Sequence, residues 1–414
     1  MSFDLTIKNA KIESMDGLYN LLIADGKIVK ITKETEFTAN NTIDAFGKLL
    51  SPAFIDPHIH LDKTNIVDVV RPNQSGTLLE AIEIIWEKKK NYTIEDIMAR
   101  ASKTIEESIK NGTTRLRTHV DVDSIGGLVP LRGLVETRKK YAGIVDIQIV
   151  AFPQEGILKD PGTAELMRQA MEQGADIVGG MPANEYSPED SRKHVEIVFK
   201  IARDFGADID MHVDETDDPF YRTLEMIVDK TIEYGWQGRV TAGHTCALAA
   251  YDDHYAEYVM DKAKDAGVNF VTNPVTNLML QGRCDKQPKR RGITRVKELL
   301  ERGITVSFGQ DCVRDTFYPF GKADLLEVAL ITAHAAHMSL PHEIKTVFDM
   351  CTVNAAKIWG IEQDYGIKEG GRADLVLLDC DNVHDAIRLQ PDRLYVFREG
   401  RILATTQKES RKFY

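Results

Sequence analysis

The sequence predicts an α/β protein: a (β/α)8 TIM-like barrel with a small β-sandwich domain formed from both termini. Three observations support this prediction. In the middle of the chain, short apolar runs alternate with amphipathic helical stretches, which is typical of a parallel sheet with helical crossovers. At both ends, apolar and polar residues alternate singly, as in strands with one exposed face. The length of 414 residues suits a closed barrel with an appendage better than a single small domain.

The two terminal segments, residues 1–50 and 366–414, are expected to form the β-sandwich domain. In the first segment, Asp25-Gly26 separates two alternating runs and predicts a hairpin turn. In the second, three short apolar runs between residues 373 and 404 repeat the pattern. Residues 51–365 are expected to form the barrel. Its predicted buried strands include residues 144–152, 176–180, 209–213, 240–244, 269–271 and 305–309, with helical patterns between them, as over residues 163–173 and 295–302.

Composition narrows the range of partners. The formal net charge of -12 argues against a nucleic-acid partner and leaves a small-molecule substrate as the expectation. No apolar run approaches the roughly 20 residues that span a bilayer, so no membrane association is expected. The first residues lack a basic segment followed by an apolar one, which favours a cytoplasmic protein. The 5 cysteines show no paired spacing and are expected to be reduced.

The strongest local signal for chemistry is the pair His58 and His60. The two residues are separated by one position at the end of an apolar run, so on a strand they point to the same face. Two imidazoles on one face at the end of a strand form half of a site for a divalent metal. Alone, the pair is also compatible with one packed and one solvated histidine.

Further candidate ligands follow other predicted strands. His212 and His244 each end an apolar run, and Asp311 lies just past another. In a barrel the carboxyl ends of all strands meet at one face, where active sites lie. Glu215, three positions after His212, is well placed for proton transfer beside a metal, although alone it could be a solvated loop acid.

Two residues after other apolar stretches are candidates for the pocket. The primary amide of Gln154 offers a donor and an acceptor, which match the lactam edge of a heterocycle. His119 also ends an apolar stretch, and a supporting or pocket-wall role is as consistent with the pattern as a direct one.

At this point the sequence resembles the cytosine deaminase branch of the amidohydrolase superfamily, over nearly the whole chain. The matching pieces are Pro57-His58-Ile59-His60-Leu61-Asp62, Asn73-Gln74-Ser75-Gly76-Thr77-Leu78, Arg117-Thr118-His119-Val120-Asp121-Val122, Val150-Ala151-Phe152-Pro153-Gln154-Glu155-Gly156, His212 to Glu215, Leu280-Gln281-Gly282-Arg283 and Lys289 to Lys297. The resemblance implies a distorted barrel with a β-sandwich, in agreement with the patterns above. It also implies a homo-oligomer, a small heterocyclic substrate and hydrolytic release of ammonia from it.

The resemblance implies that His58, His60, His212 and Asp311 hold one divalent ion, Zn²⁺ or Fe²⁺. Relatives with two ions use a carboxylated lysine at the end of the fourth strand. Here residues 177–182 contain no lysine, which favours a single ion.

The implied mechanism is hydrolysis of the carbon–nitrogen bond to an exocyclic amine. His244 and Asp311 would orient and deprotonate the attacking water, and Glu215 would pass a proton to the ring nitrogen beside the attacked carbon. The resemblance implies a substrate pocket in which Gln154 fixes the ring edge, with apolar walls from Leu78, Phe152 and Phe317.

This chain departs from cytosine deaminase at two pocket positions. Cys312 replaces an aspartate that follows the metal aspartate, and Phe317 replaces a tryptophan on the next loop. A cysteine removes a charge and leaves a smaller, softer wall. We therefore expect a pocket shifted towards a methylated ring, creatinine or 5-methylcytosine, and cytosine is the third candidate substrate. A buried structural cysteine is the other interpretation of Cys312.

Two other functions remain compatible with the sequence. One is hydrolysis of a different bond, either in a cyclic amide, as in hydantoinases, or to an N-alkylamine on a triazine. The absent bridging lysine and the presence of Glu215 favour deamination over both reactions. The other is a non-catalytic binding protein on the same barrel, which would be expected to lack a metal ligand or the acid, and none is missing.

Overall fold

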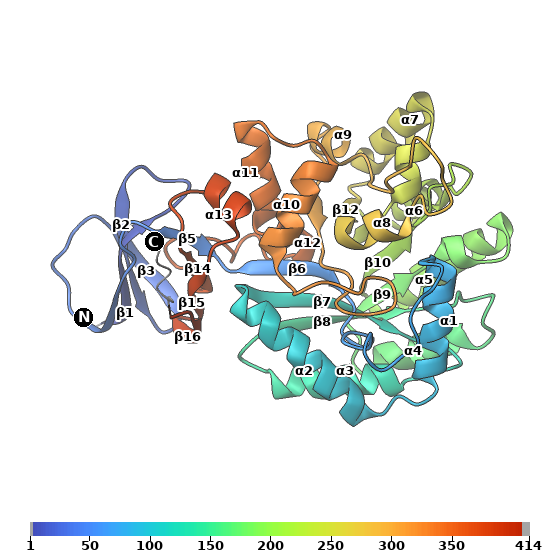
Figure 1. Ribbon diagram of the computed structural model, residues 1–414, viewed down its shortest axis with the longest axis horizontal. Helices are drawn as coiled ribbons and strands as arrows, with labels where there is room; N and C mark the ends of the chain where they lie inside the picture. Colours follow the sequence, from blue (N-terminus) through green and yellow to red (C-terminus); the bar gives the residue numbers. More distant parts are fainter. Residues whose placement is uncertain (1–2, 408–414) are drawn as a thin grey trace, which may run out of the picture.

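Eight parallel strands form the barrel in the computed structural model, which describes residues 3–407. They pair in chain order (Figure 1): β6 (Phe54–Ile59), β7 (Thr113–Asp121), β8 (Asp146–Phe152), β9 (Ile177–Gly180), β10 (Asp208–Val213), β11 (Val240–His244), β12 (Asn269–Thr272) and β13 (Val306–Phe308). Almost every residue of these strands is buried, because helices cover their outer side and side chains fill the interior. Each predicted strand is present, with its ends shifted by at most two residues.

The barrel is closed where β13 meets β6. A parallel bridge joins Ile59 to Asp311, beyond the last residue of β13. Two backbone hydrogen bonds flank it: the amide of Asp311 donates to the carbonyl of His58 over 2.8 Å, and the amide of His60 donates to the carbonyl of Asp311 over 2.9 Å. The closure therefore brings Asp311 beside both histidines of the H-x-H pair.

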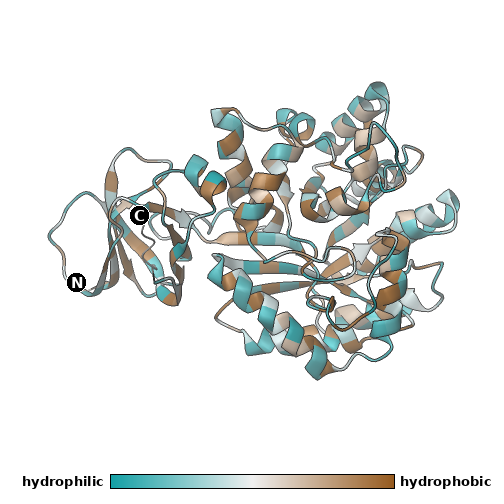
Figure 2. Cartoon of the chain, in the orientation of Figure 1, coloured by the Kyte–Doolittle hydropathy of each residue, from teal (hydrophilic) through white to brown (hydrophobic). Residues whose placement is uncertain are grey.

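The helices cover the strands and supply their packing. Figure 2 shows hydrophobic and hydrophilic residues mixed along most of them, as expected for helices with one buried face. In α2, for example, Ile97, Ala101, Ile105 and Ile109 recur every fourth residue and are all buried. The helices are α1 (Leu78–Lys89), α2 (Ile94–Lys110), α3 (Val129–Lys140), α4 (Thr163–Glu172), α5 (Pro188–Phe205), α6 (Thr223–Tyr234), α7 (Asp253–Asp265), α8 (Pro274–Leu280), α9 (Val296–Glu301), α10 (Leu325–Ala335), α11 (Pro341–Met350), α12 (Val353–Trp359) and α13 (Val383–Leu389), with short 3-10 turns at Pro182–Asn184 and Cys246–Ala250.

Strands from the two ends of the chain pair in a separate mixed sheet (Figure 1). Its strands are β1 (Phe3–Lys11), β2 (Leu18–Ala24), β3 (Lys27–Thr32), β4 (Ala39–Asp44), β5 (Leu49–Pro52), β14 (Leu375–Leu378), β15 (Arg393–Arg398) and β16 (Arg401–Thr405). The predicted hairpin joins β2 to β3, with positive φ angles of 50° at Asp25 and 74° at Gly26. A barrel with a small domain from both termini is the predicted fold class, which is confirmed.

The C-terminal segment also contributes to the barrel. Helix α13 packs there, because Val383, Ala386 and Ile387 belong to the same buried apolar cluster as the barrel helices. All 5 cysteines of the chain are unpaired, in agreement with the expectation of reduced thiols. Within residues 3–407, none of the helices is both long enough and apolar enough to cross a membrane.

Candidate metal and catalytic centre

Five candidate ligands and catalytic groups meet at the carboxyl ends of the barrel strands. His58 lies on β6, His212 lies on β10, and His244 is the last residue of β11. His60 directly follows β6, and Asp311 lies three residues after the end of β13. Because parallel strands end at one face of a barrel, residues distant in sequence become neighbours there.

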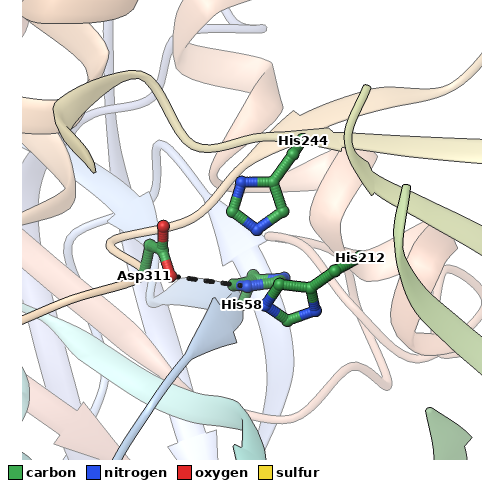
Figure 3. Close-up of side chains that lie close together, drawn as sticks. All are labelled: His58, His212, His244 and Asp311. Carbon is green, nitrogen blue, oxygen red and sulfur yellow. Dashed lines mark ion pairs between the residues drawn. The ribbon is translucent and has the colours of Figure 1, made fainter. Parts of the chain in front are cut away.

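The donor atoms of these side chains are close enough to share one ion. One donor atom each from His58, His212, His244 and Asp311 lie within 4.8 Å of one another (Figure 3). His60 is outside that group of four, yet its Nε2 is 3.2 Å from Nε2 of His212 and 3.3 Å from Oδ1 of Asp311. The structure thus brings together all four ligands expected from the sequence and adds His244 to them.

The chemistry of these residues fits a divalent cation. Both ring nitrogens of His58, Nδ1 of His212 and Oδ2 of Asp311 are buried without a hydrogen-bond partner. Burial lowers the pKa of His60 to about 4 and that of His244 to about 3, so both rings are neutral. Buried polar groups without partners are rare in folded proteins, and neutral imidazoles with a carboxylate are ligands of zinc and iron.

One backbone contact fixes how His60 presents its ring. Its Nδ1 lies 3.2 Å from the carbonyl oxygen of His119, which can only accept a hydrogen bond. Nδ1 therefore carries the proton, and Nε2 turns its lone pair toward His212 and Asp311. His119 itself lies behind the ligands, with its ring centre 4.1 Å from that of His58, and it has a supporting position rather than one on the cavity wall.

Two of the site residues have unusual backbone conformations. His244 and Asp311 have φ angles of 64° and 62°, in the left-handed region that non-glycine residues rarely adopt. Such strain persists only where surrounding structure holds it, and it is concentrated at functional sites. At Asp311 the holding contacts are the hydrogen bonds that close the barrel.

Two buried carboxyl groups of the site have pKa values that are shifted in opposite directions. Burial, together with the charge of Asp311, raises the pKa of Glu215 well above its usual value. Burial alone would also raise the pKa of Asp311. The contacts of Asp311 with His58 and His60 have the larger effect and hold this pKa well below its usual value. Neighbouring acids with opposite shifts are typical of a general acid and a general base.

Contacts on the far side of Glu215 keep it in place. Nδ2 of Asn277 donates to its Oε1 over 3.0 Å, and the same oxygen is 3.4 Å from Nδ1 of His244. Asn273 also contacts His244, with 3.1 Å between its Nδ2 and the ring Nε2. Asn277, on α8, thus connects Glu215 to His244, and Asn273, directly before α8, contacts the other ring nitrogen of His244.

A cavity of about 330 Å³ opens beside these groups. Every residue that the sequence assigned to a substrate pocket lines it, namely Leu78, Phe152, Gln154, Cys312 and Phe317. Further lining residues were not singled out from the sequence: Lys63, Ile82, Met181, Thr276 and Leu280.

Cys312 is a buried thiol on the cavity wall. Its Sγ lies 3.7 Å from Oδ1 of Asp311, and the residue is only 3% exposed. Burial, with the nearby carboxylates, raises the pKa of this thiol well above its usual value, so it is neutral. The wall at this position is therefore small and uncharged.

Lys63 is the functional candidate that sequence reasoning missed. Its Nζ donates to Oδ1 of Asp121 over 2.7 Å and to Oε1 of Gln154 over 2.5 Å, and the residue is 1% exposed. Its position three residues after His60, beyond Leu61 and Asp62, was the available signal. Lysine is rarely buried without a partner, and both partners are distant in sequence.

The end of β9 carries no lysine. The strand ends at Gly180, and Met181, the next residue, lines the cavity with a thioether. The single ion stays a prediction.

Comparisons with known proteins agree with this geometry. The solved structure of a 5-methylcytosine deaminase from Klebsiella pneumoniae superposes with a TM-score of 0.95 and 37% identity, covering 99% of each chain. N-isopropylammelide isopropyl amidohydrolase from Pseudomonas sp. (strain ADP) is 33% identical over 407 residues, 97% of each chain. A pterin deaminase from Rhizobium rhizogenes is 31% identical over 400 residues, 94% of this chain and 89% of the relative.

The resemblance to the cytosine deaminase branch is therefore confirmed by a structure of the same branch. Residues 41–404 match the sequence model of the amidohydrolase family. The protein belongs to the amidohydrolase family.

Proposed function

We propose that this protein is a metal-dependent hydrolytic deaminase that acts on 5-methylcytosine and cytosine. The observation that carries the proposal is the cavity beside the histidine cluster, which is lined by Glu215 and Asp311, two carboxyl groups whose pKa values are shifted in opposite directions, and by the buried thiol of Cys312. The first two groups suit hydrolysis, and the thiol suits a ring with a methyl substituent.

The side chains that would hold the ion are His58, His60, His212 and Asp311, with His244 close enough to contribute. A bound Zn²⁺ or Fe²⁺ would supply Lewis acidity, lowering the pKa of water from about 15.7 towards about 7. Burial of the donor set excludes competing solvent from this position.

The protein groups can then carry the protons through the reaction. Asp311, with His244 beside it, accepts a proton from the attacking water, and Glu215 donates one to the ring nitrogen next to C4. Addition of the water oxygen at C4 gives a tetrahedral centre. Transfer of the proton from Asp311 to the exocyclic amine then breaks the C4–N bond and releases ammonia. Return of the proton from the new C4 hydroxyl group to Glu215 would restore the enzyme, and the product ring then has a carbonyl at C4 and keeps the proton on its ring nitrogen.

The cavity walls support a flat, single-ring substrate. Phe152 and Phe317 offer aromatic faces, and Leu78 adds an aliphatic one. The amide of Gln154 supplies a directional polar contact. Beside Asp311, the Cys312 thiol would face the ring substituent without the desolvation cost of a carboxylate. The likeness to the Klebsiella pneumoniae 5-methylcytosine deaminase, at 37% identity over 99% of the chain, supports the same substrate class.

Removal of an N-alkylamine from a triazine is a second candidate. It is favoured by 33% identity along 97% of the chain to the Pseudomonas N-isopropylammelide isopropyl amidohydrolase. The two reactions share the hydrolytic groups and differ in the amine that leaves. A substrate with an isopropyl group needs an apolar pocket for that group, whereas a substrate that releases ammonia does not.

The test is to load the protein with Zn²⁺ or Fe²⁺ and identify the amine released from each ring of a panel. The panel contains 5-methylcytosine, cytosine, creatinine, N-isopropylammelide and hydantoin. Ammonia from the two pyrimidines, with a higher kcat/KM for 5-methylcytosine, is expected. Isopropylamine as the main product would favour the second candidate. Turnover of creatinine alone, or opening of hydantoin, would refute the proposed substrate class.

A further inference from the structure

We infer that Lys63 is a positioning residue that orients the Gln154 amide, so that the NH2 group of Gln154 donates to a carbonyl oxygen on the substrate ring. The inference rests on the proposed function and deepens it, because it names the ring feature that this side of the cavity recognises. It starts from an ammonium group that the proposed hydrolytic steps leave unused.

The Lys63 ammonium lies within the wall of the cavity. Its Nζ is 5.4 Å from the ring centre of Phe152 and 5.5 Å from that of Phe317, the two aromatic walls. It donates to Oε1 of Gln154 over 2.5 Å and to Oδ1 of Asp121 over 2.7 Å. A lysine side chain has donors and no acceptor, so only the oxygen of the amide can face it.

The remaining half of the Gln154 amide has no protein partner. Nε2 is buried and makes no hydrogen bond, although the residue is only 4% exposed and lines the cavity. A buried donor without a partner is costly unless a ligand satisfies it. The backbone of Gln154 is also fixed, because Nδ2 of Asn184 donates to its carbonyl over 2.6 Å. The NH2 group is therefore held as a donor for the substrate.

A buried charge network keeps Lys63 in this position. Asp121 is shared between two buried ammonium groups, since its Oδ2 lies 2.7 Å from Nζ of Lys89. Lys89 in turn pairs with Asp123 over 2.5 Å. Burial opposes the charge on Lys63, but Asp121 and Asp62 outweigh it and raise the pKa of the lysine. The ammonium is thus charged, which strengthens its hold on the amide oxygen.

The orientation predicts which rings bind well. A ring with a carbonyl beside the reacting amidine, such as the 2-carbonyl of cytosine, accepts the free NH2. A ring without that carbonyl leaves the donor unsatisfied. Sites built around one buried hydrogen bond discriminate strongly against analogues that lack it.

The experiment compares cytosine with 4-aminopyrimidine, which is cytosine without the 2-carbonyl. For the metal-loaded enzyme, kcat and KM are measured on both rings, and the inhibition constant is measured for pyrimidin-2-one, which has the carbonyl and no amine. In Lys63→Met we expect the preference for cytosine to fall about tenfold to a hundredfold, mainly through KM, and pyrimidin-2-one to bind more weakly by a similar factor.

Lys262→Met is the control for loss of a lysine that pairs with two carboxylates. Lys262 pairs with Glu225 and Asp229, and it does not line the cavity. It should leave the preference for cytosine unchanged. A variant in which Lys63→Met and Gln154→Leu are combined should show the same preference as Gln154→Leu alone, because Lys63 acts through the amide.

Gln154→Glu keeps the test valid if Lys63→Met does not fold. This variant keeps an oxygen for Lys63 and replaces only the NH2 group, so it should lose the preference for cytosine while melting normally. An unchanged preference in Lys63→Met or in Gln154→Glu, or additive losses in the combined variant, would overturn the inference. A wild-type enzyme that deaminates neither ring would refute the proposed function instead, and pyrimidin-2-one binding would still test the role of Lys63.

Discussion

Oε1 of Glu215 lies 3.4 Å from Nδ1 of His244, and both side chains are buried beside the cavity. Asn277 contacts both of them, which fixes the pair in place. The carboxyl group is therefore held close to the ligand cluster, and burial raises its pKa, which favours the protonated form that can donate to a ring nitrogen.

Replacement of this acid should abolish turnover without unfolding the protein. Glu215→Gln keeps the size of the side chain and removes its ability to transfer a proton, so we expect kcat to fall roughly 10²- to 10⁴-fold. Metal content and melting temperature should stay close to wild type. Asp218→Asn, in the same acidic stretch but off the cavity wall, is the control. Comparable turnover in both variants would exclude Glu215 as the acid.

The ring preference should depend on Cys312. Cys312→Asp places a second carboxyl group next to Asp311. The new carboxyl group would lose solvent when the ring substituent packs against it. We expect kcat/KM for 5-methylcytosine to fall relative to cytosine by about tenfold or more, the scale at which pockets discriminate one methyl group. Cys312→Ala keeps a small neutral wall and should retain the wild-type ranking. If Cys312→Asp also retains the wild-type ranking of the two substrates, the thiol has no role in specificity.

Metal binding should be lost when a central ligand is replaced. His212→Ala removes one of the donors that converge on Asp311, and we expect the protein to contain much less than one divalent ion per chain, measured by elemental analysis. His194→Ala is the control for loss of a buried histidine, since His194 is paired with Glu185 over 2.7 Å and lies off the cavity wall. Chelation of the wild type should lower its melting temperature, and added Zn²⁺ or Fe²⁺ should restore it. Two ions per wild-type chain would contradict the single site.

Stability should fall as the pH rises, because of Asp315. Burial raises the pKa of this carboxyl from 3.8 to about 7. Its Oδ1 accepts from the amides of Phe317 and Tyr318, while Oδ2 has no partner. The folded state therefore favours the protonated form. That contribution is complete below about pH 4 and is lost as the pH rises toward 7, by roughly 1.4 kcal/mol per pH unit at most.

Asp315→Asn tests this assignment, because the amide cannot ionise and keeps an oxygen for the two backbone donors. Its free energy of unfolding should depend less on pH than that of wild type between pH 4 and 7. Denaturant titrations at several pH values measure the difference. Parallel curves for the two proteins would show that Asp315 is ionised in the folded state as it is in the unfolded chain.

The barrel could be predicted from sequence because its signals are local. Apolar runs such as those of β10 and β11 mark strands, and polar residues at their ends mark the functional face. His58, His212, His244 and Asp311 were found in this way. The left-handed φ of Asp311 could not be predicted, because it depends on the closure between β13 and β6 and has no local signature.

Lys63 could not be predicted because its partners are remote. Asp121 and Gln154 are 58 and 91 residues away along the chain. The sequence indicated Gln154 as an amide that could both donate and accept. The structure shows its oxygen already bonded to Lys63, which leaves the donor half for a ligand. Only the packed barrel brings the ammonium group and the amide together.

The most direct measurement of the proposed reaction is product analysis with 5-methylcytosine in ¹⁸O-labelled water. Hydrolytic deamination predicts thymine with one labelled oxygen at C4 and one ammonia per ring. The proposed reaction would be contradicted if the metal-loaded protein left 5-methylcytosine and cytosine unchanged while it hydrolysed another ring of the panel.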